Sequence, residues 1–233
     1  MSKKGGSRHA LRIGAQKRIG IKHRKGIKWL LAPCPGAHKR EESISAGVLL
    51  RDILEKARNL HEVQKILNSG NLLVDGRKIK DKRFPIGLMD IVTLPAQKIS
   101  YRMSLSGPNM VPKELSQKAA SKKYLRVTKK HTAKGGKTAI TFHDGRAHAG
   151  DKHIKVGDTC VLSVPQFKLE SHIKLEPGVQ CLVIKGKHTG ELAKLDKIIE
   201  RTGSHGAEAH LSGASGEFVT LVKYLFAVDK DYE

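Results

Sequence analysis

Two glycine-lysine pairs are the residues of this sequence best suited to holding a phosphate. They are Gly136-Lys137-Thr138 and Gly186-Lys187-His188. A Walker loop requires G-x-x-x-x-G-K-[ST], because its backbone amides surround the phosphates, its lysine neutralises them and its hydroxyl binds magnesium. His131 stands at the leading glycine position of the first pair, and His188 replaces the hydroxyl residue of the second. Neither pair therefore predicts nucleotide hydrolysis.

The histidines do not form a metal-binding pattern. His61-Glu62 matches the start of a zinc-protease helix, but Lys65 stands where the second histidine is required. Cys34 and His38 lack two further nearby ligands. Three other histidines are spaced by five residues, which suits neither a helix face nor a strand face: His143, His148 and His153. We expect no metal and no other cofactor.

Catalytic arrangements are also missing from the sequence. There is no G-x-S-x-G elbow, and no pair of carboxylates stands out for acid-base chemistry. Cys34, Cys160 and Cys181 are odd in number and have no CxxC spacing, which predicts three free thiols. We expect a protein that is not an enzyme.

The basic residues are concentrated in two segments. The chain has 44 Lys and Arg against 22 Asp and Glu, a formal net charge of +22. Residues 1–40 hold 12 basic and no acidic side chains, and residues 97–137 hold 11 and 1. Residues 41–96 hold 9 and 8, and residues 138–233 hold 12 and 13. This distribution predicts a polyanionic partner, and the first segment is expected to take a fixed shape only against phosphates.

The composition is that of a folded protein outside the membrane. With 233 residues, of which 39% are hydrophobic, the chain can build one large core or several small ones. No apolar run reaches the roughly 18 to 20 residues of a membrane span, and the N-terminus lacks the apolar region of a secretory signal. We expect a soluble, cytoplasmic protein.

Residues 43–97 have the clearest secondary-structure pattern. Apolar residues at helical spacing predict one short helix over 46–57, and a second helix is predicted from a cap at Asn59 to Gly70. A hairpin with an Asp75-Gly76 turn follows, and then a strand over Ile91–Leu94. Arg51, Arg58 and Lys65 recur every seven residues and could project to one side.

The rest of the chain is dominated by strand signals. Short β-rich stretches occur at 124–127, 138–142 and 160–164, with turns at Asp144-Gly145 and Gly157-Asp158. Residues 104–123 contain Pro108 and Pro112 and few bulky residues, which predicts a loop with a short helix. Residues 218–228 predict one strong C-terminal strand.

Several of these stretches together resemble one family. Residues 47–92 are similar to the alpha-L RNA-binding domain, in which two helices and a hairpin present one basic face. FPIGLMD at 84–90 is more specific, and resembles the archaeal and eukaryotic small-subunit ribosomal protein family S-four-e. HRKGIKW at 23–29, PGAHK at 35–39, KGGKTAITFHDGR at 134–146, VGDTCVLSVP at 156–165 and HIKLEPG at 172–178 follow the same family pattern in the same order.

The stretch PGVQCLVIKGKHTGELAKLDKI at 177–198 resembles a KOW element, the hairpin of a small SH3-like barrel. In that pattern Gly186 and Gly190 are turn glycines, with Lys185, Lys187 and His188 near the tip. The chain stops soon after its last predicted strand, so the resemblance is closer to the shorter archaeal form.

These observations give an α+β, multidomain fold class. We expect a basic N-terminal extension over 1–42, an alpha-L domain over 43–97, a small central β-barrel over 98–172, and a KOW or SH3-like β-barrel over 173–233. Trp29 in the extension either packs on protein or stacks on a base.

The side chains expected to contact RNA are basic residues of all four segments. They are Arg8, Arg12, Lys17, Arg18, Lys22, Arg24, Lys25, Lys28, Lys39, Arg40, Arg51, Arg58, Lys65, Arg77, Lys78, Lys80, Lys82, Arg83, Lys122, Lys123, Arg126, Lys129, Lys130, Lys134, Lys137, Lys185, Lys187 and His188. The charge counts call for phosphate contacts.

The family resemblance implies a structural component of the small ribosomal subunit that binds ribosomal RNA through its backbone and shape and supports assembly and translation. Its expected partners are small-subunit ribosomal RNA and neighbouring ribosomal proteins, with no membrane and no small-molecule substrate. Two alternatives stay open at this point: an accessory protein of an RNA-modifying enzyme and a free RNA-binding regulator.

Overall fold

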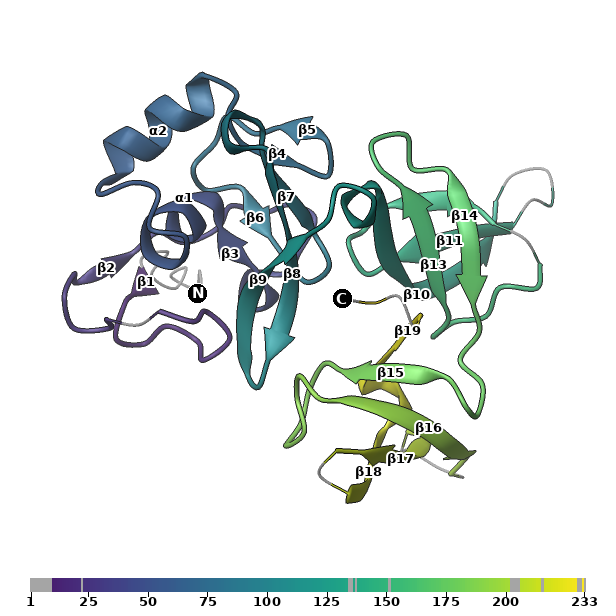
Figure 1. The fold of residues 1–233 in the computed structure, drawn as a ribbon. Helices are drawn as coiled ribbons and strands as arrows, with labels where there is room; N and C mark the ends of the chain where they lie inside the picture. The colour runs from purple at the N-terminus through teal and green to yellow at the C-terminus, as the bar shows by residue number, and fades with distance from the viewer. Residues whose placement is uncertain are drawn as a thin grey trace, which may run out of the picture.

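The protein is mostly β, with two short α-helices in the described residues (Figure 1). The structure, a computed structural model, describes residues 10–21, 23–133, 136, 138–150, 152–201, 206–214, 216–229 and 232. The strands of this part form three five-stranded sheets and two two-stranded sheets. Each five-stranded sheet belongs to a different stretch of the chain, so the three sheets follow one another in sequence.

The first unit combines the helices with a five-stranded sheet of order β5-β4-β7-β8-β9. Its elements are β3 (Ile44–Ser45), α1 (Ala46–Val48) continuing into a wider π-helical turn (Leu49–Ile53), α2 (Leu60–Asn68), β4 (Leu73–Val74), β5 (Arg77–Lys78), β6 (Pro85–Ile86), β7 (Ile91–Leu94), β8 (Ile99–Ser106) and β9 (Asn109–Leu115). Two helical segments and the hairpin are present, but the first segment ends at Ile53 instead of continuing to residue 57 as predicted.

Local signals explain the helix start and the turn of this unit. The Asn59 side chain accepts hydrogen bonds from the backbone N–H groups of His61 and Glu62, both at 3.0 Å, and so caps α2. Asp75 and Gly76 have φ of 51° and 76°, the left-handed pair that a two-residue hairpin turn requires.

The loop predicted over residues 104–123 is wrong in its first half. β8 and β9 form a long antiparallel hairpin that extends the first sheet. Pro112 is tolerated because β9 is an edge strand, where a missing backbone N–H breaks no ladder. Because β7 also pairs with β8, the boundary expected at residue 97 falls inside one continuous sheet.

The N-terminal segment does not stand apart from this unit as the extension we expected. β1 (Ala10–Leu11) pairs with β2 (Trp29–Leu30), and Ile19 bridges to Met110 of β9. Ala15, Ile19 and Leu30 are buried in the same core as α1, α2 and the first sheet. The apolar residues between the basic ones therefore fold this segment onto its own chain.

The central unit is a sheet of order β12-β11-β10-β13-β14. Its strands are β10 (Lys122–Thr132), β11 (Thr138–Phe142), β12 (Ala147–Ala149), β13 (Thr159–Ser163) and β14 (Leu169–Ile173). All three predicted strand stretches of this unit are strands, and its core is formed by the inward residues of β10, β11 and β13.

The C-terminal unit is a sheet of order β18-β17-β16-β15-β19. Its strands are β15 (Gln180–Val183), β16 (Leu192–Ile199), β17 (Glu208–Gly213), β18 (Gly216–Leu221) and β19 (Leu225–Val228). The single strand predicted over 218–228 is wrong, because a 3-10 turn at 222–224 separates β18 from β19, and the two lie at opposite edges of the sheet.

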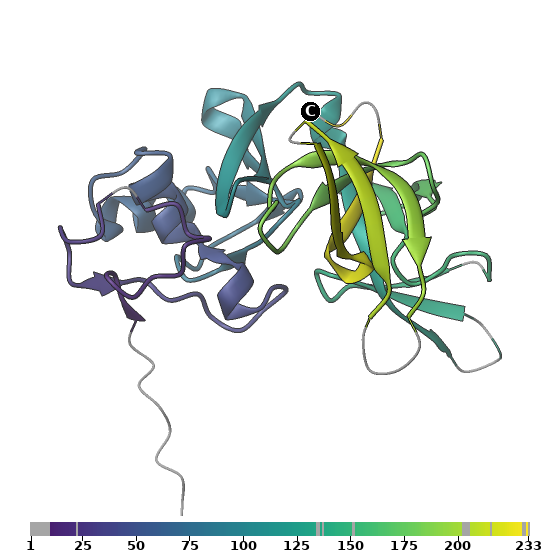
Figure 2. The same ribbon diagram turned by 90° about the horizontal axis from the view of Figure 1, so that it is seen from below.

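The three units meet around β19 and the C-terminal Tyr232. β19 contacts β10 and β13 of the central unit, and the turned view shows the C-terminal sheet lying against the rest of the molecule (Figure 2). The Tyr232 hydroxyl lies 2.8 Å from the Ser104 hydroxyl of β8, and the Arg102 guanidinium lies over the Tyr124 and Tyr232 rings. These contacts form the junction between the units.

Candidate nucleic-acid interface

Exposed lysines cover the N-terminal segment. Lys17, Lys25 and Lys28 are exposed, and Arg18 and Arg24 are half-buried. Arg24 donates to the Ala15 carbonyl at 2.8 Å. The expected contacts Arg8, Lys22, Lys134 and Lys137 lie outside the described residues.

Arg12 is a correction to the expected set. Its side chain is buried, both terminal nitrogens lie 3.1 Å from Asp52 Oδ1, and its Nε donates to the His23 carbonyl at 2.6 Å. Burial alone would raise the pKa of Asp52, but Arg51 and Arg12 outweigh it and lower that pKa. Arg12 therefore anchors the N-terminal segment to the first helix, and its buried side chain is not accessible to RNA.

A second basic surface surrounds α2 and the β4–β5 hairpin. Arg58 and Lys65 are exposed, whereas Arg51 lies in the π-helical turn and is ion-paired with Asp52 at 2.9 Å. The seven-residue spacing therefore does not produce a row of three free cations. Around the hairpin, Lys82 is half-buried and four cations are exposed: Arg77, Lys78, Lys80 and Arg83.

Lys123 is the clearest correction. Its side chain is 0% exposed, and its Nζ lies 2.6 Å from Asp75 Oδ2, 2.7 Å from Asp90 Oδ1 and 3.5 Å from Asp144 Oδ2. Arg146 closes the cluster with 3.0 Å ion pairs to Asp75 and Asp144. Lys123 thus joins the β4–β5 turn, the start of β7 and the β11–β12 turn, and no RNA phosphate can reach it.

The charges of this buried cluster are set by one another. Burial disfavours charged Lys123, but the three carboxylates outweigh burial and raise its pKa. Burial also acts against charged Asp90, yet Lys123 and His38 lower its pKa. His38 Nε2 lies 2.9 Å from Asp90 Oδ2, and this carboxylate raises the pKa of His38 despite burial. The cluster is therefore an internal ionic network.

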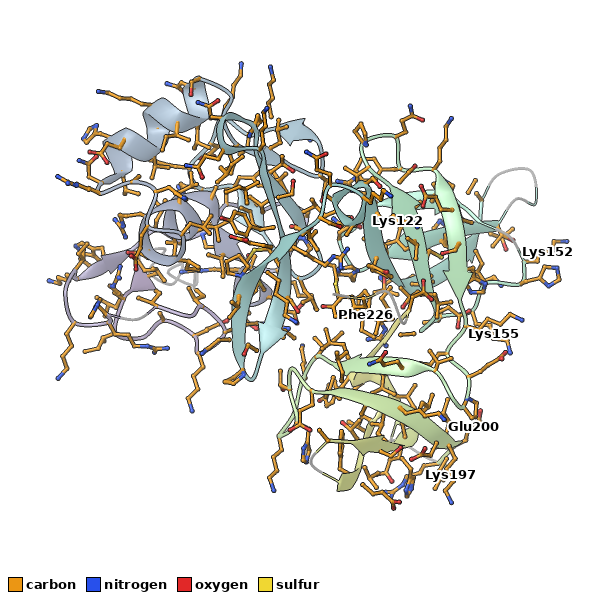
Figure 3. The ribbon with its side chains drawn as sticks, in the orientation of Figure 1. Lys122, Lys152, Lys155, Lys197, Glu200 and Phe226 are labelled. Atoms are coloured by element: carbon orange, nitrogen blue, oxygen red, sulfur yellow. The ribbon has the colours of Figure 1, made fainter. Side chains whose placement is uncertain are left out.

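Both ends of β10 present further cations, Lys122 at its start and Lys129 and Lys130 near its end. Lys122, Lys129 and Lys130 are exposed, and Lys130 donates to the Lys152 carbonyl at 2.7 Å. Lys152 and Lys155 lie on the side of the central unit away from the first unit (Figure 3).

The stretch at 177–198 forms the β15–β16 hairpin, and its loop makes intramolecular contacts with other parts of the protein. Gly186 and Gly190 have φ of 103° and 87°, as turn glycines require. Lys185 Nζ pairs with Glu42 at 2.6 Å, and the His188 ring stacks on Phe218 with centroids 4.1 Å apart. Lys187, the third predicted tip residue, is exposed.

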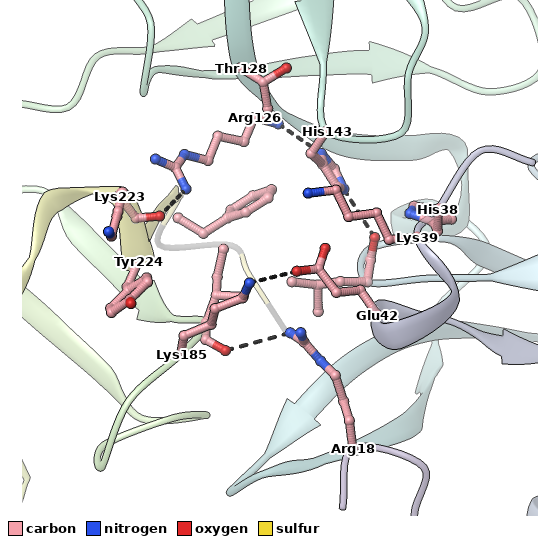
Figure 4. A pocket seen from close by; sticks show the side chains of 13 residues that line it. Arg18, His38, Lys39, Glu42, Arg126, Thr128, His143, Lys185, Lys223 and Tyr224 are labelled. Atoms are coloured by element: carbon pink, nitrogen blue, oxygen red, sulfur yellow. Dashed lines mark hydrogen bonds and ion pairs between the residues drawn. The ribbon is translucent and has the colours of Figure 1, made fainter. Parts of the chain in front are cut away.

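Four predicted residues that are far apart in sequence meet at one cavity: Arg18, Lys39, Arg126 and Lys185 (Figure 4). The cavity has a volume of about 470 Å³ and is also lined by Glu42, His143, Lys223, Tyr224 and Phe226. We call it the junction cavity. The sequence analysis did not predict Lys223 and Tyr224 as site residues. The signal in the sequence was that these two polar side chains interrupt the largely apolar run at 218–228.

Comparison with known proteins places the chain in a family. The profile of the Ribosomal family S4e matches residues 100–169. The chain is 38% identical over 211 residues to Small ribosomal subunit protein eS4 of Methanothermobacter thermautotrophicus, covering 90% of this chain and 87% of that protein. This chain belongs to the S4e family of ribosomal proteins.

Two further S4e proteins match over most of the chain. Small ribosomal subunit protein eS4 of Methanosphaera stadtmanae is 35% identical over 232 residues, covering 99% of this chain and 96% of that protein. The crystal structure of the 30S ribosomal protein S4e from Thermoplasma acidophilum superposes with a TM-score of 0.70 at 30% identity, covering 82% of this chain and 96% of that chain. The β-rich fold is thus an S4e fold.

Other classes of site are not found in the described part of this S4e protein. No group of three His, Cys, Asp or Glu side chains there could hold a metal ion. No described helix is long and apolar enough to cross a membrane. The cysteines are free thiols, as predicted, with Cys160 and Cys181 buried.

Proposed function

We propose that this S4e protein is a structural component of the small ribosomal subunit, located in the cytoplasmic ribosome, that binds ribosomal RNA and supports assembly and translation. The observation that carries the proposal is the match over 90% of the chain to a protein named for the small ribosomal subunit. The family points to a structural rather than a catalytic role. Its expected partners are ribosomal RNA and neighbouring ribosomal proteins.

The proposed RNA contacts are the predicted basic residues that the fold leaves accessible. They fall into three groups: the N-terminal lysines, the cations around α2 and the β4–β5 hairpin, and the exposed lysines of β10. These groups lie on different elements and would follow the RNA backbone rather than read bases. Arg12 and Lys123 do not belong to this set, because both are buried in ion pairs.

We further propose that the first unit acts as an alpha-L domain and the β15–β16 hairpin as a KOW element of an SH3-like unit. The helix-helix-hairpin order of residues 46–78 and the two left-handed glycines of the 184–191 loop support this assignment. On this proposal β8 and β9 are additions to the alpha-L sheet, and the N-terminal segment packs on its core.

Sedimentation tests the proposed function. The tagged chain, expressed in cells that carry archaeal-type ribosomes, is expected to sediment with small subunits in a sucrose gradient and to stay with them when low magnesium separates the subunits. High salt should release it, because phosphate contacts weaken with salt. A free regulator or an enzyme accessory would remain in the slow fractions, and that result would reject the proposal.

A further inference from the structure

We propose that the junction cavity is a binding site for one unpaired RNA nucleotide, with the nucleotide's phosphate among its basic side chains and the base beside Tyr224. The inference rests on the proposed RNA-binding function. It adds to that function a specific binding site, the junction cavity, and a specific ligand, an unpaired nucleotide. Nothing in the sequence pattern singles out this site, because its lining comes from seven separate stretches of the chain (Figure 4).

The lining has a large excess of positive charge. Five cationic side chains, Arg18, Lys39, Arg126, Lys185 and Lys223, face one carboxylate, Glu42, a surplus of four. Glu42 is already engaged by Lys185 at 2.6 Å, which lowers the pKa of Glu42 although burial acts in the opposite direction. One internal carboxylate leaves the cavity with an excess of positive charge, which favours binding of an anion from outside.

Arg126 shows where that anion would bind. Its Nη1 donates to the Lys223 carbonyl at 2.6 Å, but its buried Nε has no hydrogen-bond partner in the described residues. Burial lowers the pKa of Arg126, and the Cys181 thiol that acts on it is itself neutral, because burial raises the pKa of Cys181 to about 12. This guanidinium lines the cavity and has no carboxylate partner in the described residues, so a phosphate in the cavity would supply its counter-charge.

The wall of the cavity next to Arg126 is formed by His143. Burial lowers the pKa of His143 to about 4, so its ring is neutral at neutral pH. The His143 Nδ1 accepts from the Arg126 backbone N–H at 3.2 Å, which leaves Nε2 to donate to the Leu88 carbonyl at 3.1 Å. The edge of this ring meets Phe226 at 5.6 Å between centroids. This wall fixes the backbone of Arg126 and adds no competing charge.

Size and lining favour a nucleotide over a bare anion. A volume of about 470 Å³ exceeds the space one phosphate needs and lies in the range of small-molecule sites. The Tyr224 ring, with Lys223 Nζ 5.4 Å from its centroid, gives a base a surface to stack on. A base stacked on Tyr224 would bring its own phosphate toward the cations of the same cavity.

Binding of a short 5′-phosphorylated oligouridylate to the full chain tests the proposal. Lys223→Gln is expected to weaken binding of this RNA by about three- to tenfold, because one phosphate contact is lost. The slope of log K against log salt concentration should become shallower by about 0.7 for the same reason. Lys197→Gln is the matched control, since it removes the same charge from the far end of the C-terminal sheet (Figure 3) and should change neither value. Equal effects of the two variants would overturn the proposal.

A crosslink gives a second readout that does not depend on a variant's folding. A 4-thiouridine version of the oligonucleotide is expected to crosslink within residues 222–228 of the wild-type chain, and a crosslink confined to other segments would overturn the assignment. Inorganic phosphate or an acidic peptide competing as well as the oligonucleotide would also overturn it, in favour of an anion or a protein partner. Lys223→Gln should still sediment with small subunits, so loss of the nucleotide site and loss of the proposed function are distinguishable.

Discussion

At the scale of single residues, a lysine's neighbours in the fold decide whether it binds RNA or holds the protein together. Lys122 and Lys123 are adjacent, and their charges are identical in the sequence. Successive side chains of a strand point to opposite faces, so β10 exposes Lys122 and buries Lys123. The three carboxylates that receive Lys123 come from residues 21 to 48 positions away along the chain. Local sequence could not reveal that partnership.

The Lys123→Met substitution should therefore destabilise the protein strongly. It leaves Asp75, Asp90 and Asp144 buried, with Arg146 beside Asp75 and Asp144 and His38 beside Asp90 as the remaining partners. Removing one partner of a buried ion pair costs about 3–5 kcal/mol, and urea unfolding measures the loss. Lys122→Met, on the exposed face of the same strand, is the control and should stay within about 0.5 kcal/mol of wild type. Similar unfolding midpoints for both variants would contradict the role given to Lys123.

His143 predicts a pH dependence of stability with a definite sign. Its folded pKa of about 4 lies below the unfolded value of about 6.5. Between these values the unfolded chain binds the proton and the folded chain does not, so stability falls as pH falls. The loss attributable to His143 is on the order of 3 kcal/mol across this window.

Comparing the pH dependence of the unfolding free energy in wild type and His143→Gln isolates the contribution of His143. His38, Asp144 and Lys123 act on His143, and all three remain in the variant. Because the pKa of His38 is raised, His38 is protonated in both states below about pH 6.5 and contributes no slope there. Unfolding measured from pH 7 to pH 4 should show a flatter pH dependence in the variant, and parallel curves would refute the assignment.

At the scale of elements, the β15–β16 loop is held by the β8–β9 hairpin as well as by its own turn. A Cβ added to Gly190 would meet the Gly107 backbone nitrogen at 2.6 Å and its oxygen at 2.9 Å, whereas one added to Gly186 would meet nothing within 4 Å. Both glycines have positive φ. The two positions therefore differ in the contact and share the strained backbone.

Alanine substitution at these glycines separates the two effects. Gly186→Ala should cost about 1 kcal/mol from backbone strain alone. Gly190→Ala should cost about 1–3 kcal/mol more, because the backbone of Gly107 has to move as well. Chemical unfolding gives both values, and faster amide exchange at 106–109 in Gly190→Ala alone would locate the change. Equal costs would show that the hairpin contact does not stabilise the fold.

Most elements could be predicted from local sequence, and the errors have physical causes. The cap at Asn59 and the turn at Asp75-Gly76 are specified by nearby residues, so both were predictable. β9 was missed because an edge strand tolerates Pro112 and needs few bulky residues. The split between β18 and β19 was missed because both strands are apolar, and the turn between them lacks glycine and proline.

At the scale of the whole molecule, the positive charge is distributed by folding in a way that segment counts do not show. The C-terminal 96 residues have no excess charge, yet they supply Lys185 and Lys223 to the junction cavity. The most basic segment, residues 1–40, in turn contributes apolar side chains, Ile19 and Leu30, to the main core. Deleting residues 1–40 would therefore damage the fold and could not measure phosphate contact alone.

Substituting exposed lysines, instead of deleting the segment, tests which part of the protein makes most of the phosphate contacts with RNA. The triple substitution of Lys17, Lys25 and Lys28 to Gln removes exposed charges from the N-terminal segment and leaves its buried residues intact. If each lysine contacts a phosphate, the slope of log K against log salt for a small-subunit RNA fragment should fall by about 2–3.

A matched triple substitution of Lys174, Lys194 and Lys197 to Gln supplies the comparison. These lysines are exposed on or beside the C-terminal sheet, so the net charge changes equally in both variants. If RNA responds only to total charge, both triples should lower the slope by the same amount. If position matters, as the fold indicates, the C-terminal triple should keep nearly the wild-type slope, because its charges lie outside the three proposed contact groups.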